Sequence, residues 1–303
     1  MILKVDNVNK YYNDFHAVKN LSFQVEENMI YGILGRNGAG KTTTIRMIMD
    51  IYEPEIGNIE RNYSPEKVSY LPEERGLYPN LTVKETLNFF GEIKGMSKKQ
   101  ISQAKNYWLE RFDLTGWHEK KIEELSKGMQ QKVQFIISCF NKPKLLILDE
   151  PFSGLDPVNM QIFKDEILKL KKENTTVLFS SHIIEHVEYL STNVLVIDNG
   201  EKVIDGKLSD IKKEYGKKTI FVRYDGKSDK LNNELVKNID DYGSYAEIFL
   251  NDPDKHNKYL NMIAPEVNIL EYRIDVPSLK SIFINKVGMI EEGKNDRQMA
   301  NNI

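Results

Sequence analysis

A glycine-rich loop between a short apolar run and a helical stretch narrows the possible folds of this chain more than any other segment. The loop, Gly35-Arg-Asn-Gly-Ala-Gly-Lys-Thr42, matches the pattern GxxxxGK[ST]. It follows the apolar run 29–34 and precedes a segment of helical character at 41–50. Glycines permit a tight turn whose N–H groups point inward, and the positive N-terminus of the next helix adds to this cradle. The segment therefore predicts a phosphate-binding loop between a strand and a helix.

A second motif places acidic residues near that loop. The apolar strand predicted at 144–148 ends at Asp149, which puts a carboxylate at the carboxyl edge of the sheet. There we expect it near a Mg²⁺ ion bound by the Thr42 hydroxyl, with Lys41 reaching the β- and γ-phosphates of a nucleotide. Glu150 follows one residue later, where it can polarise an attacking water. Together the two motifs predict a nucleotide site with Mg²⁺.

These motifs leave the class of phosphate-loop protein open. A GTPase needs an Asn-Lys-x-Asp guanine reader, but Asn141-Lys-Pro-Lys144 carries Lys in place of the Asp and precedes the acidic strand. We interpret that segment as a helix-to-strand turn. A small-molecule kinase would carry a lid rich in arginine, and lysine dominates among the 42 basic residues of this chain.

Composition excludes several broad classes. Of the 303 residues, 40% are hydrophobic and 29% are charged, which argues against a disordered, collagenous or membrane-spanning chain. The net charge of −3 gives no basic field that would attract nucleic acid. No apolar run approaches the roughly 20 residues that span a bilayer, and the N-terminus resembles a strand rather than a targeting signal. The single cysteine, Cys139, lies in an apolar helical run and is predicted to be a core residue.

Strands that alternate with helices predict a mainly parallel α/β sheet in residues 1–217, with short strands at 1–33 and a helical subdomain at about 82–143. Residues 218–290 predict a small α+β domain of ferredoxin-like βαββαβ type, followed by a polar tail at 291–303. In this domain we expect strands at 219–224, 245–250 and 267–274, helices at 230–238 and 255–264, a weakly marked strand near 239–242, and a last helix opening at Pro277.

Further motifs surround the first two in a fixed order: Tyr12, the loop, Tyr70-Leu-Pro-Glu-Glu-Arg-Gly-Leu77, Leu125-Ser-Lys-Gly-Met-Gln130, Leu148-Asp-Glu-Pro151, Ser153-Gly-Leu-Asp156 and Ser180-Ser-His182. In this order the chain, up to about residue 215, resembles the ATP-binding-cassette (ABC) ATPases. The strings around Glu73 and Ser126, with the C-terminal unit, resemble the ATPase subunits of ABC-2-type exporters for sodium extrusion or for drug and peptide efflux. The resemblance implies an α/β P-loop (RecA-like) ABC nucleotide-binding domain.

The resemblance implies a role for each matching residue. Tyr12 would stack on adenine, with Tyr11 as its competitor. The phosphates would be held by Asn37, Gly38, Ala39, Gly40, Lys41, Thr42 and Thr43. Mg²⁺ would be bound by Thr42, Glu73 and Asp149, and catalysis would use Glu150 and His182. ATP held by a second copy would be contacted by the signature residues Ser126, Lys127 and Gly128, and Asp156 would cross the dimer seam.

Two positions depart from the family pattern. Glu73 stands where the family usually has Gln, and it adds negative charge near the phosphates. Lys127 stands where the family usually has Gly in Leu-Ser-Gly-Gly-Gln, and we expect its side chain to be solvated. Ser126 and Gly128 are retained, so the resemblance still implies the phosphate contact in trans.

The resemblance implies that ATP and Mg²⁺ are the cofactors and that the chain powers export by head-to-tail dimerisation. Its partners would be a second copy or a homologous ATPase subunit and integral membrane permease subunits, with no nucleic acid. It would be cytoplasmic, peripheral on the inner face of the cell membrane through the permease. A groove near Tyr78, Phe89 and Phe90 would receive a helix of that permease. The alternatives are an importer ATPase and a soluble or regulatory ABC ATPase. The domain after residue 217 is predicted not to be catalytic.

Overall fold

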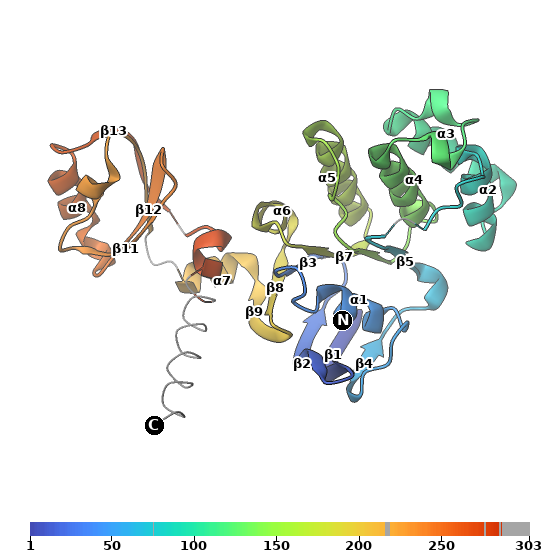
Figure 1. Cartoon of the computed structure of the whole chain (residues 1–303), viewed down its shortest axis with the longest axis horizontal. Helices are drawn as coiled ribbons and strands as arrows, with labels where there is room; N and C mark the ends of the chain where they lie inside the picture. Colours follow the sequence, from blue (N-terminus) through green and yellow to red (C-terminus); the bar gives the residue numbers. More distant parts are fainter. Residues whose placement is uncertain (75, 216–218, 276, 285, 287–303) are drawn as a thin grey trace. The chain divides into compact units, whose positions relative to one another are not determined.

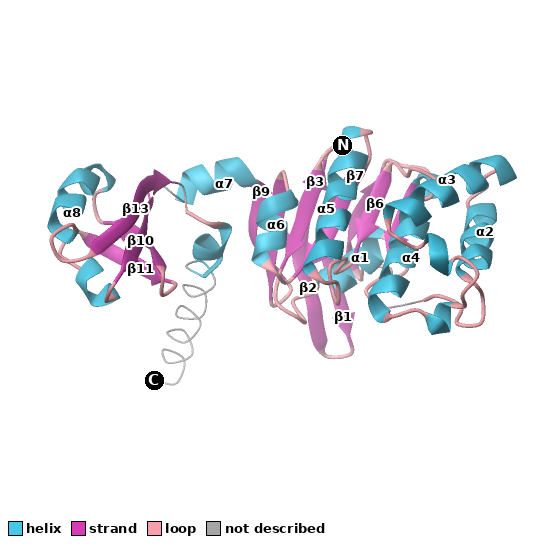
Figure 2. Ribbon diagram, turned by 90° about the horizontal axis from the view of Figure 1, so that it is seen from above, coloured by secondary structure: helices cyan, strands magenta, loops and turns pink. Residues whose placement is uncertain are grey.

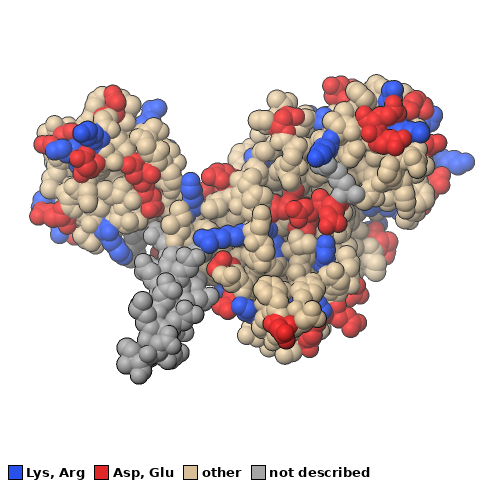
Figure 3. Space-filling model, in the orientation of Figure 1, with Lys and Arg blue, Asp and Glu red and all other residues tan. Residues whose placement is uncertain are grey.

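The computed structural model describes residues 1–74, 76–215, 219–275, 277–284 and 286, and contacts divide the chain into two units (Figure 1). The first unit spans Met1–Asp205 and the second begins at Gly206. This division falls earlier than the predicted boundary after residue 217. The polar tail expected at 291–303 lies outside the described residues. Charged side chains of both signs are interspersed on the visible face of each unit (Figure 3).

A six-stranded sheet forms the centre of the first unit. Every recorded pairing among β5, β6, β7, β3 and β8 is parallel, which confirms the predicted α/β architecture. The four residues of β6 are all buried, as expected for an uninterrupted apolar run in the middle of a parallel sheet. The strand order is β5 (Val68–Leu71), β6 (Leu145–Leu148), β7 (Thr176–Ser181), β3 (Ile30–Leu34), β8 (Asn193–Asp198) and β9 (Glu201–Lys207).

Helices cover both faces of this sheet. Helices α5 (Pro157–Lys172) and α6 (Ile184–Leu190) lie on one face, and α1 (Lys41–Ile48) lies on the other (Figures 1 and 2). The buried side chains of α1, among them Ile45 and Ile48, join a core that continues into a second, three-stranded sheet. This core fixes α1, and with it the end of the glycine loop, beside β3.

The three-stranded sheet has the order β2 (Phe15–Val25), β1 (Leu3–Tyr12) and β4 (Ile56–Arg61). The strands expected at 1–33 are present, but β1 and β2, with 10 and 11 residues, are longer than predicted. Their pairing shifts register between Val5 and Val8 and again before Tyr11. A bulge interrupts the alternation of inward and outward side chains. The hydrophobic pattern of one long strand therefore resembles that of several short strands.

The segment at about 82–143, where a helical subdomain is expected, is largely helical. Its helices are α2 (Val83–Ile93), α3 (Lys98–Arg111) and α4 (Lys127–Cys139), with single turns η1 (Pro65–Lys67), η2 (Thr115–Trp117) and η3 (Ile122–Glu124) nearby. Thr82 with Glu85 forms a capping box at the start of α2, which satisfies two N–H groups of the first turn. Phe112 and Phe135 pack against Phe163 of α5 and join the subdomain to the sheet.

The second unit opens with α7 (Leu208–Tyr215) and contains an antiparallel sheet of order β11 (Val236–Asp241), β12 (Tyr245–Leu250), β10 (Thr219–Asp225) and β13 (Asn268–Asp275). Two split crossovers give this order, as in a ferredoxin-like sheet. Helix α8 (His256–Ile263), preceded by η5 (Pro253–Lys255), lies in the second crossover. Ile220, Ile248 and Tyr259 share a separate core.

The helix predicted at 230–238 is wrong. The chain forms the short turn η4 (Ser228–Leu231) and then enters β11. The Asn233 side chain accepts a hydrogen bond from the Leu235 N–H at 3.0 Å, a local turn that competes with helix formation. A helical stretch begins at residue 279 rather than at Pro277, and Ser278 Oγ accepts from Ser281 N at its start.

Candidate functional site

The glycine loop connects the carboxyl end of β3 to the first turn of α1 (Figure 1). Gly38 and Gly40 have φ values of +80° and +100°, which L-residues rarely adopt. A Cβ at Gly40 would lie 2.7 Å from the carbonyl oxygen of Ala17. The loop therefore needs glycine for its conformation and for its close approach to β2, and it exposes backbone N–H groups at a helix N-terminus.

Lys41 begins α1, and its ammonium is turned back over the loop. Its Nζ donates to the carbonyl oxygens of Gly35 at 2.8 Å and Arg36 at 3.2 Å. The same atom lies 3.2 Å from Glu150 Oε1, in an ion pair whose side chains are both more than nine-tenths buried. A nearly buried lysine is stable when it is paired in this way. Lys41 thus connects the loop to Glu150, the second residue of the acidic pair that follows β6.

Asp149 follows β6 and is completely buried. Its Oδ1 accepts a hydrogen bond from Ser180 Oγ at 2.5 Å. Burial raises the pKa of Asp149, while hydrogen bonds from Ser180 and Thr42 oppose that shift. Within the residues that the structure describes, no donor reaches Asp149 Oδ2. A buried carboxylate oxygen without a donor beside the Thr42 hydroxyl fits a metal ligand.

Glu150 is held in an unusual backbone conformation, with φ at +47°. Its N–H donates to Ser180 Oγ at 2.9 Å, and its Oε2 lies 2.9 Å from His182 Nδ1. Ser180 and His182 come from the end of β7 and the residue after it, so neighbouring parallel strands bring these groups together. No role is predicted for Ser180 from the sequence, although it lies in the Ser180-Ser-His182 motif and contacts both acidic residues.

A cavity of about 320 Å³ lies over the loop. Of the predicted residues, it is lined by Tyr12, Asn37, Gly38, Gly40, Lys41, Thr42, Thr43, Glu73 and Glu150. Ala39 faces the hydrophobic core instead. Asp149 and His182 do not line the cavity and reach it through their contacts with Thr42 and Glu150.

Aromatic residues form one end of this cavity. Tyr12 lines it, whereas Tyr11 is absent from the lining and stacks on His16 with ring centroids 4.0 Å apart. Phe15 also lines the cavity, and 62% of its surface is exposed. Phe15 is not among the residues predicted from the sequence; its one signal is its position directly after the turn that follows Tyr12.

Mg²⁺ would depend on oxygen atoms from several sources. Within the described ranges, no three side chains of His, Cys, Asp or Glu converge as a metal site. Mg²⁺ commonly binds one or two carboxylates together with substrate phosphates and water. Asp149 and the Thr42 hydroxyl fit that pattern, and Glu73 lines the same cavity.

The signature residues lie elsewhere in the first unit. Ser126 caps α4, and its Oγ accepts from Met129 N at 3.3 Å. Ser126 and Lys127 are exposed, and Gly128 approaches the Gly154 carbonyl. Asp156 caps α5, and the N–H of Asn159 lowers the pKa of this carboxyl. These four predicted residues, Ser126, Lys127, Gly128 and Asp156, are absent from the lining of the chain's own cavity.

Two family models match the chain. The model described as ABC transporter matches residues 18–153, and the one described as ATP-binding protein DrrA1-3-like, C-terminal domain, matches residues 206–287. The second match begins where the second structural unit begins. Among the described residues, no helix combines the length and hydropathy of a membrane span.

Curated relatives and solved structures agree with these models. The chain is 40% identical to the ABC transporter ATP-binding protein YhaQ of Bacillus subtilis, over 96% of this chain and 100% of that protein. It is 29% identical to the linearmycin resistance ATP-binding protein LnrL of the same organism, over 95% and 98% of the two chains. A solved ATP-binding subunit of an ABC transporter matches with a TM-score of 0.67 and 28% identity, over 71% of this chain and 93% of that one. The chain belongs to the family of ABC transporter ATP-binding proteins.

Proposed function

We propose that this chain is the ATPase that powers export through a separate membrane permease, and that two copies close head to tail around ATP. The observation that carries the proposal is the single cavity lined by Tyr12, the glycine loop, Glu73 and Glu150. An aromatic ring, a phosphate cradle and a carboxylate beside it are the parts that binding and hydrolysis of ATP require.

Each residue has a role in this proposal. Tyr12 stacks on adenine, and the N–H groups of the loop with Lys41 bind the phosphates. Thr42 and Asp149 hold Mg²⁺, which neutralises phosphate charge when it is bound. Glu73 lines the same cavity, where it would add a ligand for Mg²⁺ or a negative charge that repels the phosphates.

Glu150 is the proposed general base. Its Oε1 pairs with Lys41 and its Oε2 with His182, so ATP phosphates that attract Lys41 would weaken the first contact. His182 would then hold Glu150 toward a water beside the γ-phosphate. A positioned base within hydrogen-bond reach of the proton it removes meets the geometric requirement for this role.

A second copy completes the proposed site. Ser126, Gly128 and Asp156 are needed for the cycle but do not line the cavity of their own chain. The start of α4 offers N–H groups and a positive dipole end, which suit a phosphate presented by another subunit. ATP is then a ligand of the interface and shifts an open–closed equilibrium.

The exporter role draws on relatives. LnrL is named for linearmycin resistance, and a protein of Cupriavidus metallidurans that is 34% identical over 68% of this chain is named for Nod factor export. We propose that this chain likewise lies at the cytoplasmic face of the membrane, bound to a permease through the side chains near Tyr78 and Phe89, which are 52% and 40% exposed.

The test is ATP turnover together with recovery at the membrane. The chain is expressed with and without the hydrophobic subunits encoded beside it, and membranes are assayed for the chain and for ATP hydrolysis. We expect recruitment only with those subunits, and loss of turnover in Lys41→Ala without loss of recruitment. Turnover without any membrane partner that recruits the chain would instead favour a soluble ABC ATPase.

A further inference from the structure

A larger cavity, of about 570 Å³, lies at the opposite edge of the central sheet from the glycine loop. Its lining includes Lys67, Lys142 and Glu173, which stand just before β5, β6 and β7. These strands are parallel to β3, whose carboxyl end holds the loop, so this cavity lies at the amino ends of the strands. It shares no lining residue with the cavity over the loop.

The cavity has an apolar wall. Its apolar lining residues come from the helical subdomain and from α5: Met96, Ala104, Trp108, Cys139, Phe140 and Leu170. Trp108 and Phe140 are 6% and 3% exposed, so their rings are fixed by packing. Burial raises the pKa of Cys139 to about 12, which keeps this thiol neutral and makes it part of the apolar wall.

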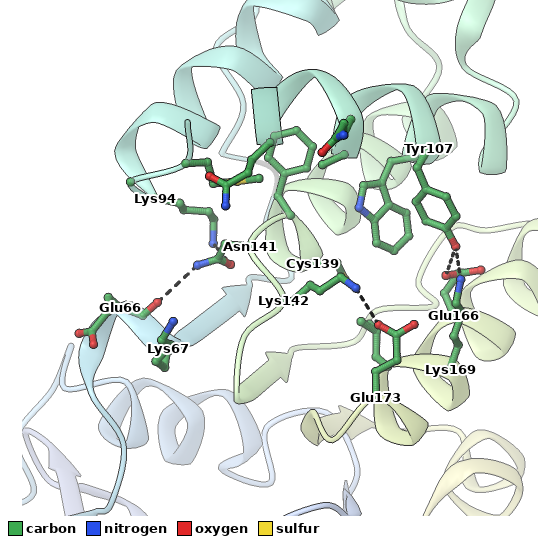
Figure 4. Close-up of a pocket in the computed structure, with 18 residues that line it drawn as sticks. Glu66, Lys67, Lys94, Tyr107, Cys139, Asn141, Lys142, Glu166, Lys169 and Glu173 are labelled. Carbon is green, nitrogen blue, oxygen red and sulfur yellow. Dashed lines mark hydrogen bonds and ion pairs between the residues drawn. The ribbon is translucent and has the colours of Figure 1, made fainter. Parts of the chain in front are cut away.

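Lys94 brings an ammonium to one end of the cavity (Figure 4). Its Nζ donates to Ser69 Oγ at 2.7 Å and approaches Asn141 Oδ1 at 3.4 Å, and both partners are neutral. Over the described part of the chain, no carboxylate lies within ion-pair distance of Lys94. Burial lowers the pKa of this amine. A partly buried ammonium without a counter-charge gains more from an anion than an exposed lysine does.

The carboxylates of the lining are directed elsewhere. Glu166 is buried and accepts from Arg111 Nε at 2.6 Å and from the Tyr107 hydroxyl at 3.1 Å. Glu173 pairs with Lys142 at 3.1 Å. The Glu66 carboxylate points away from Lys94 (Figure 4). The end of the cavity at Lys94 is therefore positive next to an apolar wall.

We propose that this cavity binds a small organic anion, whose carboxylate or sulfonate pairs with Lys94 and whose apolar body lies on Trp108 and Phe140. The volume is within the range of ligand sites, about 300–1,000 Å³. The site is separate from the ATP site and does not depend on its assignment.

The position of the cavity gives such a ligand a means of influencing the ATPase. Met96 and Trp108 belong to the helical subdomain, whereas Leu170 belongs to α5 on the sheet. A ligand that contacts both the helical subdomain and α5 stabilises the arrangement of subdomain and sheet to which it binds most tightly.

Trp108 provides the readout. The chain has two tryptophans, and Trp117 is 39% exposed outside the lining, so Trp117→Phe leaves Trp108 as the only reporter. Decanoate is titrated into this full-length variant, with decanol as the uncharged match. We expect a saturable change in Trp108 emission with decanoate, and binding of decanol weaker by about tenfold or more, as for loss of a charge-assisted contact.

Lys94→Met, added to this variant, is expected to weaken the binding of decanoate by about tenfold to hundredfold. The affinity for decanol should not change. Lys99→Met, which removes an exposed lysine of α3 outside the lining, is expected to bind decanoate as the parent does. ATP binding by each variant checks that it is folded. Absence of a saturable signal with decanoate overturns the site. Equal binding of decanol and decanoate by the parent, a comparison that needs no variant at Lys94, overturns the assignment of an anion.

Discussion

Ser180 holds both acidic residues of the candidate site in place, although its own chemistry takes no part in the proposed reaction. Its hydroxyl donates to Asp149 and accepts from the N–H of Glu150. The second contact fixes Glu150 at a positive φ, a conformation that costs free energy unless its surroundings enforce it. The geometry of the base therefore depends on a residue of the neighbouring strand.

Replacing Ser180 by Ala is expected to destabilise the protein by about 1–3 kcal/mol, because two buried partners lose their hydrogen bonds. ATP turnover should fall as Glu150 loses its position. Urea unfolding and turnover measure the two effects. Ser138→Ala is the matched control, since the partners of that buried hydroxyl among the described residues are a backbone carbonyl and Cys139 in α4. Turnover lost equally in both variants would contradict a positioning role for Ser180.

Asp149→Asn is expected to raise the melting temperature of the nucleotide-free protein near pH 7.5, by on the order of 2–4 °C. Burial raises the folded-state pKa of Asp149 above its unfolded value of about 3.9. Ionisation of Asp149 is therefore less favourable in the folded protein than in the unfolded chain. The free energy of unfolding falls as the pH rises from about 4 through the folded-state pKa.

Melting curves from pH 4 to pH 8 test this sign. The difference between Asp149→Asn and the parent should shrink toward pH 4, where both side chains are neutral. The same variant should bind ATP with little response to added Mg²⁺. A melting temperature lowered at pH 7.5 would contradict the account of this buried carboxylate.

At the scale of elements, the N-terminus of α4 is the part of the proposed site that a second subunit must receive. Subunits carrying Lys41→Ala have a phosphate loop that cannot bind ATP, but they keep Ser126. Subunits carrying Ser126→Arg keep the phosphate loop and lose the signature contact. Their mixture contains one complete composite site, so ATP should produce dimers in the mixture and in neither variant alone. Sedimentation velocity distinguishes these species. Equal absence of dimers in all three samples would count against head-to-tail closure.

The sequence predicted those elements whose signals are local. The glycine loop, the buried run of β6 and the capped helices of the subdomain each carry their pattern within a few residues. Bulges hid the length of β1 and β2, since each register shift reverses the alternation. The helix expected at 230–238 does not form. The Asn233 side chain accepts from the Leu235 N–H there, and this local turn competes with a helix.

The candidate site was predictable to the same extent. Lys41, Asp149 and Glu150 lie in motifs whose spacing implies their contact, and the structure places Lys41 against Glu150. Phe15 and Ser180 reach the site through the pairing of strands, and pairing across a sheet depends on packing that one sequence does not reveal.

For the whole molecule, the separate core of the second unit predicts independence of the ATP site. None of the described residues from 206 onward is among those that line the cavity over the loop. A chain ending at residue 217 should therefore bind ATP within about threefold of the full chain, since distant units with their own cores act nearly independently. Calorimetry measures this affinity, with full-length Lys41→Ala as the negative control. Loss of ATP binding in a folded truncation would show that the second unit completes the site.

The most direct test of the account is turnover by Glu150→Gln, since the proposed cycle depends on this one carboxylate as general base. The variant should bind ATP as the parent does, accumulate as an ATP-bound dimer, and hydrolyse ATP about 10²–10⁴-fold more slowly. Glu185→Gln, an exposed residue in the first turn of α6, is the matched control and should retain full turnover. Near-normal hydrolysis by Glu150→Gln would contradict the assignment and place the base elsewhere.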